Sequence, residues 1–98
     1  MLSPLPIFLV GLGQVIRRLR KQTGDSQERF ASLVGVHRTY MGHLERGTAN
    51  PTVKTLHLVA QSLGMSIGEL ITLAEREGTL RKVAEPSARG PRAPKRKM

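Results

Sequence analysis

Apolar residues recur along the middle of this chain at the spacing of an α-helix. They fall at positions i, i+3, i+4 and i+7, which places them on one face of a helix and leaves the polar residues on the other faces. Two segments carry the full stripe: Leu12, Val15, Ile16 and Leu19, then Leu56, Val59, Ala60 and Leu63. No convincing strand pattern accompanies them. The pattern therefore predicts an all-α fold.

Capping residues and glycines indicate where these helices begin and end. Ser26 is a favoured N-cap, and Asp25-Ser-Gln-Glu28 also matches a capping box with its acid at the third helical position. Thr52 is another N-cap, and Ser66-Ile-Gly-Glu69 is a second capping box. A glycine, the residue favoured just after a helix, follows each apolar segment, at Gly24, Gly35, Gly47, Gly64 and Gly78.

These signals predict five short helices within about residues 11–77. The second helix runs from about Ser26 to Val34 and the third from about His37 to Arg46. We expect the first helix to begin near Leu12 and the fifth to end near Glu77. The inward-facing residues of the two middle helices are expected to be Phe30, Ala31, Val34, Met41 and Leu44.

The chain divides into three parts by composition. Residues 1–10 form an N-terminal extension with an apolar run, too short for a bilayer, which takes about 20 apolar residues. A signal peptide is the alternative for this extension, although it lacks a basic start and an evident cleavage site. Residues 11–77 form the helical domain. Residues 78–98 contain prolines and basic residues with little to bury, so we expect a disordered basic tail.

The distribution of charge along the chain indicates what kind of partner it binds. The chain carries a net charge of +9, and from Thr79 onward seven Lys or Arg residues accompany the single acid Glu85. Such asymmetry indicates a polyanionic partner, either nucleic acid or an acidic membrane surface. On DNA, the tail is expected to add affinity without specificity. The chain has no Cys, which fits a reducing cytoplasm and excludes disulfides.

The second and third helices, joined by a tight turn at Gly35, have the order of a helix-turn-helix. In that geometry the second of the two helices lies in the major groove of DNA. With Met41 and Leu44 inward, the exposed strip is expected to hold five residues without an acid: Arg38, Thr39, Gly42, His43 and Arg46. For one isolated helix, a solvated polar face is the simpler interpretation. The preceding helix, the turn and the two following helices favour DNA binding instead.

Several motifs resemble the phage-repressor (Xre/Cro-like) helix-turn-helix family over about residues 11–74. They are Ser26-Gln-Glu-Arg-Phe-Ala31, Gly35-Val36, Arg38-Thr-Tyr-Met41, Leu44-Glu-Arg-Gly47, Asn50-Pro51 and Leu63-Gly64. The Arg-Thr-Tyr and Glu-Arg-Gly segments are particularly similar to controller proteins of restriction–modification systems. The resemblance implies a five-helix, lambda-repressor-like DNA-binding domain.

The resemblance also implies roles for individual residues. The positions that would read bases are Arg38, Thr39 and His43. The positions that would contact the DNA backbone are Ser26, Gln27, Tyr40 and Arg46. Arg20 and Glu45 match a pair that ties the first helix to the end of the recognition helix. Two residues depart from the family pattern: Asp25 stands where an apolar residue is usual, and Gly42 stands where Ser is common. A glycine at residue 42 would either lower the stability of the helix, by up to about 1 kcal/mol relative to Ala, or permit closer approach to DNA.

Other chemistry finds little support in the sequence. The three histidines, His37, His43 and His57, lack the i, i+4 spacing and the neighbouring acids of a metal site. No nucleophile–base set or phosphate-binding loop is present, so we expect neither an enzyme nor a cofactor.

The leading hypothesis is a sequence-specific, repressor-like transcriptional regulator that binds a palindromic operator in double-stranded DNA as a homodimer. Leu73 and the segment 7–10 are candidates for the dimer interface, because apolar residues exceed what the core needs. The alternatives are the antitoxin of a toxin–antitoxin pair, or a protein-interaction module using the same surface with a toxin or co-regulator as partner. A cytoplasmic location without membrane attachment is expected.

Overall fold

The computed structural model describes residues 4–84 of the chain. The regular secondary structure of these residues consists of α-helices alone. In chain order they are α1 (Leu5–Thr23), α2 (Gln27–Val34), α3 (Arg38–Arg46), α4 (Val53–Ser62) and α5 (Ile67–Ala84). The all-α, five-helix expectation is therefore confirmed. The predicted tail beyond residue 84 and the first three residues lie outside the described part.

Short-range hydrogen bonds set the helix starts. The Ser26 hydroxyl accepts from the amide of Arg29, so Ser26 is the N-cap of α2. Glu28 is therefore the second residue of α2. A capping box that begins at Asp25 would have made it the third. Thr52 caps α4 as expected. At the start of α5 the box is complete, since the Ser66 hydroxyl accepts from the Glu69 amide and the Glu69 carboxylate accepts from the Ser66 amide.

The first and last helices are longer than the apolar pattern predicts. Residues 5–10, assigned to an extension, form the first turns of α1, and Phe8 packs against the core. Gly78 does not end the fifth helix, which continues to Ala84, so the prediction of a disordered tail is wrong for residues 78–84. A Cβ atom on Gly11 would lie 2.6 Å from the Gly78 nitrogen. Gly11 therefore lets the backbone of α1 cross directly on the backbone of α5 at residue 78, which lies inside the helix.

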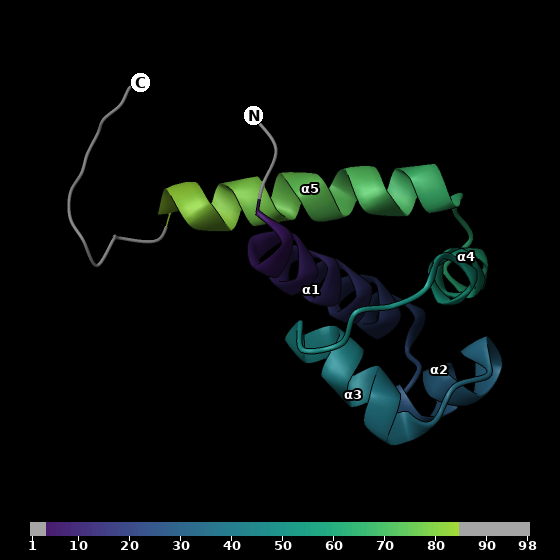
Figure 1. Cartoon of the computed structure of the whole chain (residues 1–98). Coiled ribbons are helices and arrows are strands. Elements are labelled where there is room, and N and C mark those ends of the chain that lie inside the picture. The colour runs from purple at the N-terminus through teal and green to yellow at the C-terminus, as the bar shows by residue number, and fades with distance from the viewer. Residues whose placement is uncertain (1–3, 85–98) are drawn as a thin grey trace.

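A single core joins the five helices. Every inward-facing residue expected in α2 and α3 is buried. The buried apolar side chains are Leu12, Val15, Ile16, Phe30, Ala31, Val34, Met41, Leu44, Ala49, Leu56, Val59, Ala60, Leu70 and Ala74. Figure 1 shows α5 along one side of the molecule, with α2 and α3 on the opposite side and α1 between them. The helix-turn-helix pair and α5 thus offer two separate surfaces.

Candidate nucleic-acid interface

The turn between α2 and α3 is short and well bonded. Gly35 ends α2 in the left-handed region, at φ 92°, and its amide donates to the Ala31 carbonyl at 2.8 Å. Only two further residues precede α3. His37 is the N-cap of α3, and its Nδ1 accepts from the Thr39 amide at 3.0 Å. Because a side chain other than glycine is strained at this φ, the turn depends on Gly35.

The outer face of α3 carries most of the predicted base-reading and backbone-contacting residues. Arg38, Thr39, His43 and Arg46 are exposed, whereas Tyr40 is half-buried and packs against the core. The acid of α3, Glu45, is buried. The exposed strip of α3 is therefore free of negative charge and presents groups that can donate hydrogen bonds to bases or phosphates.

The sequence pattern places Gly42 on the exposed strip of α3, and this expectation is wrong. Gly42 is buried, because the Arg46 side chain folds back along the helix above it. A Cβ atom on Gly42 would lie 3.2 Å from Arg46 Nη1 and 3.6 Å from the Gln27 side-chain oxygen. Because glycine has no side chain, Gly42 leaves room for the side chains of Arg46 and Gln27. A sequence pattern does not reveal this packing.

Behind this surface, an ion pair connects α1 to α3. Arg20 Nε donates to Glu45 Oε2 at 2.6 Å, and Arg20 Nη2 donates to Glu45 Oε1 at 3.0 Å. The two side chains are only 10% and 3% exposed. The hydrogen bond to Glu45 raises the pKa of the Arg20 guanidinium above its ordinary value and outweighs the opposing effect of burial. The pair is thus bidentate, charged and withdrawn from water.

The same ion pair also holds α2. Gln27 Nε2 donates to Glu45 Oε1 at 3.0 Å, and Arg20 Nη1 donates to the Asp25 carbonyl at 2.9 Å. One carboxylate therefore ties α1, α2 and α3 together. The resemblance indicated the Arg20–Glu45 pair, but not that Gln27 belongs to it. Asp25, the unusual residue at this turn, is accommodated by its side-chain contacts with Thr23 and Arg29.

A close backbone approach, which sequence reasoning missed, sets the distance between α1 and α3. Gly13 of α1 is buried against the last turn of α3. A Cβ atom there would lie 2.6 Å from the Leu44 carbonyl oxygen, well inside van der Waals contact. Gly13 therefore lets α3 rest directly on the backbone of α1. The only sequence signal is a glycine within a helical segment, next to the apolar stripe.

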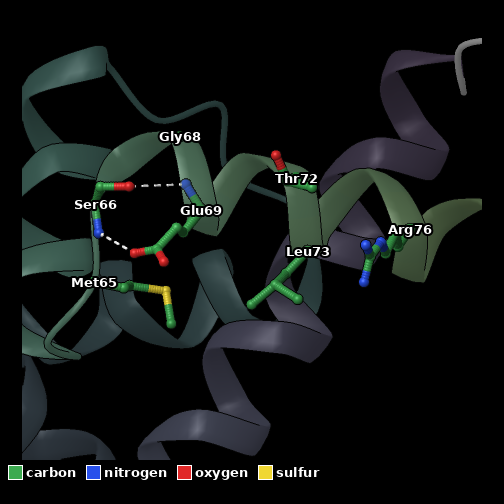
Figure 2. A pocket seen from close by; sticks show the side chains of 7 residues that line it. All are labelled: Met65, Ser66, Gly68, Glu69, Thr72, Leu73 and Arg76. Carbon is green, nitrogen blue, oxygen red and sulfur yellow. Dashed lines mark hydrogen bonds between the residues drawn. The ribbon is translucent and has the colours of Figure 1, made fainter.

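A groove of about 480 Å³ lies at the start of α5, away from α3. Figure 2 shows the side chains of Met65 and Leu73 pointing into it, with the Ser66–Glu69 capping box on one side and Arg76 at the other end. Its lining residues are Met65, Ser66, Gly68, Glu69, Thr72, Leu73 and Arg76. Leu73, a candidate for the dimer interface, is half-buried within it.

Among residues 4–84, no group of three His, Cys, Asp or Glu side chains is arranged to hold a metal ion. No single described helix is long and apolar enough to cross a membrane; only α4 and α5 taken together, bent by 96°, reach that length and hydropathy.

Both the sequence and the structure of this chain are similar to known DNA-binding regulators. The helix-turn-helix family model matches residues 16–70. The uncharacterised helix-turn-helix-type transcriptional regulator y4dJ of Sinorhizobium fredii is 44% identical over 61 residues, covering 62% of this chain and 79% of that protein. The restriction–modification controller protein C.AhdI of Aeromonas hydrophila is 40% identical with a TM-score of 0.61, covering 63% of this chain and 94% of that chain. A third match is the controller protein C.Esp1396I, a tetramer in complex with its natural 35-base-pair operator. It is 29% identical with a TM-score of 0.64, and covers 74% of this chain and 95% of that chain.

Proposed function

This chain belongs to the helix-turn-helix (Xre/Cro-like) family of DNA-binding, non-enzymatic transcriptional regulators, and from that premise we propose that it binds a palindromic operator as a homodimer. The observation that carries the proposal is the outer face of α3. This face presents Arg38, Thr39 and His43 to solvent, while the one acid of the helix is buried.

Within this function, Arg38, Thr39 and His43 read base edges in the major groove, where each base pair presents a distinct pattern of donors and acceptors. Ser26, Gln27, Tyr40 and Arg46 contact the sugar–phosphate backbone and set the register. The structure supports a positioning role for Gln27, since Glu45 already holds its amide nitrogen.

Homodimer formation is the second part of the proposal. One module reads only a few base pairs, so two copies on half-sites about one helical turn apart supply the remaining specificity. The controller protein C.Esp1396I occupies its operator as a tetramer. The surface of α5 with the Leu73 groove suits the contact between copies, since it lies on the side of the molecule opposite to α3 (Figure 1). Residues 7–10, the other candidates for this interface, are half-buried in the first turns of α1.

A gel-shift with the DNA that flanks this protein's own gene tests the function directly. We expect a complex that survives an excess of random competitor DNA, because base contacts add to the non-specific phosphate contacts. Equal binding to the flanking and the random DNA would contradict an operator-specific regulator.

Arg38→Ala is expected to cost about 1–3 kcal/mol of binding free energy per half-site and to relax the preference at one base position. The reason is that the planar guanidinium near the start of α3 matches guanine O6 and N7. Affinities for operators carrying each base at each position measure the effect. Arg46→Ala is the matched control: it removes a phosphate contact and should leave the preference at the position that Arg38 reads unchanged. A uniform loss with Arg38→Ala would overturn its base-reading role.

Leu73→Glu is expected to shift the protein from dimer towards monomer, because it places a charge in an apolar interface. Sedimentation at high micromolar concentration without DNA measures the shift. Val53→Glu is the control, since Val53 is 73% exposed on α4 and outside the groove. A wild-type protein that sediments as a monomer at this concentration, both without DNA and in a parallel run with DNA, would contradict the homodimer.

A further inference from the structure

One side of α5 carries a strip of four residues at helical spacing. They fall at positions i, i+4, i+7 and i+11 and therefore share one face of the helix: Glu69, Leu73, Arg76 and Leu80. Figure 2 shows Glu69 and Arg76 on either side of Leu73, along the groove that Met65 also lines. Leu80 continues the strip beyond the groove and is 63% exposed. The strip thus has an acid near the start of α5, a base further along, and apolar side chains between and beyond them.

The charges of this strip are complementary to those of a second, antiparallel copy of it. Glu69 and Arg76 are equally distant from the point between Thr72 and Leu73. Where two copies of α5 pack antiparallel across a two-fold axis at that point, each residue faces the residue at the same distance on the other side. Glu69 of either copy then faces Arg76 of the other, and the contact contains this ion pair twice.

The side chains of Glu69 and Arg76 are suited to this pairing. A helix rises by 1.5 Å per residue, so each of the two lies about 5 Å along α5 from the axis, within reach of the other's long side chain. Glu69 Oε1 accepts from the Ser66 amide at 2.9 Å, which holds the carboxylate in place and leaves its other oxygen for a guanidinium. The Arg76 side chain is exposed and has no hydrogen bond or ion pair within residues 4–84.

The same two-fold axis pairs the apolar ends of the strip. Met65 and Leu80 are also equally distant from the point between residues 72 and 73, so Met65 of one copy faces Leu80 of the other. Met65 is half-buried in the groove, and covering the exposed Leu80 side chain favours association. A parallel arrangement would instead set each residue against its own copy, with Glu69 facing Glu69 and Arg76 facing Arg76. Like charges opposite each other disfavour that arrangement.

We propose that this strip joins two copies of the chain with their α5 helices antiparallel, and that two reciprocal Glu69–Arg76 ion pairs set the register. The proposal rests on the homodimer of the proposed function, and adds the orientation of the two helices and the residues that select it. Complementary charges across an interface fix its register and disfavour other partners more than they add affinity. Leu73, next to the axis, supplies apolar contact area.

Charge reversal tests the ion pairs in the full-length protein without DNA, by sedimentation equilibrium. Glu69→Arg and Arg76→Glu each create two like-charge contacts in a homodimer and should weaken dimerisation roughly tenfold to hundredfold. An equimolar mixture of the two variants should form a heterodimer with nearly wild-type affinity, because both contacts then join opposite charges. The control is Glu75→Arg, the same change of charge at an exposed position of α5 outside the groove, which should leave the dimer nearly unchanged.

Neutral variants separate the charge of Glu69 from its role as a helix cap. Glu69→Gln keeps the bond to the Ser66 amide, since glutamine also completes a capping box. Glu69→Gln and Arg76→Gln should each weaken the dimer roughly twofold to tenfold. The double variant should be no weaker than either single variant, because all three lack the same ion pairs. This comparison decides the question if circular dichroism shows that Glu69→Arg is unfolded.

Leu80→Ser tests the register itself. Leu80 lies outside the groove, so it enters the contact only when the helices are antiparallel about the point between residues 72 and 73. We expect a loss of roughly fivefold in dimer affinity from the apolar area that stays uncovered. Leu33→Ser is the matched control, because Leu33 is 54% exposed on α2.

Three outcomes would overturn the antiparallel register. They are additive losses in the neutral double variant, no recovery in a mixture of two folded charge-reversal variants, and a dimer that Leu80→Ser leaves unchanged. If Leu73→Glu still dissociates the wild-type dimer in any of these cases, the homodimer stands and only the register is wrong. A monomeric wild type would overturn both.

Discussion

Replacing Glu45 with glutamine is expected to lower the free energy of unfolding by about 3–5 kcal/mol, a large part of the roughly 5–15 kcal/mol that stabilises a small domain. The substitution keeps the size of the side chain but removes its charge, and so leaves the buried Arg20 guanidinium without a counter-charge. Because Arg20 and Glu45 are 10% and 3% exposed, water cannot take over that role. Thermal and denaturant unfolding followed by circular dichroism measure the loss.

The matched control is Glu77→Gln, which breaks the ion pair with Arg18 on the surface. The side chains of Arg18 and Glu77 are 48% and 22% exposed, so this change should cost less than about 1 kcal/mol. The double variant Arg20→Met, Glu45→Leu should recover much of the lost stability, because it removes both charges and keeps apolar volume. An unchanged melting temperature in Glu45→Gln would show that the pair contributes nothing.

Gly13→Ala is expected to destabilise the domain by about 3 kcal/mol, the upper end of the usual cost of overpacking. The added methyl group would lie 2.6 Å from the Leu44 carbonyl oxygen, and backbone atoms cannot rotate away as a side chain can. The helices α1 and α3 must separate instead. Since Glu45 and Arg20 span the same two helices, their ion pair should lengthen as well. Chemical unfolding measures the stability, and operator affinity should fall with the displacement of α3.

Gly68→Ala provides the control, in a helix of the same chain. A Cβ atom on Gly68 would meet only the Ser66 hydroxyl at 3.8 Å, so the alanine has room. Alanine favours a helix over glycine by about 0.5–1 kcal/mol, so this variant should be more stable than the wild type. If Gly13→Ala were also stabilising, the close contact between α1 and α3 would not limit the fold.

Features that depend on neighbouring residues could be predicted from the sequence. Ser26, Thr52 and Ser66 cap helices through bonds to amides three residues ahead, as their types and positions indicated. The apolar stripes identified the buried faces of α2 and α3, because a helix repeats every 3.6 residues whatever surrounds it. The family motifs added the identity of the fold and the pairing of Arg20 with Glu45. The assigned DNA-contacting roles stay predictions until binding is measured.

Features that depend on contacts between distant residues were decided only by the tertiary structure. Gly78 has the signature of a helix end, yet it lies inside α5, at the point where α1 crosses this helix at Gly11. Gly42 lies on the polar side of α3, yet Arg46 and Gln27 cover it. Gln27 reaches Glu45 across 18 positions in the chain. Capping and periodicity act within about one or two helical turns, so the sequence determines the number of helices and their buried faces, but not the outer ends of α1 and α5. Their crossing distances follow from the packing of all five helices together.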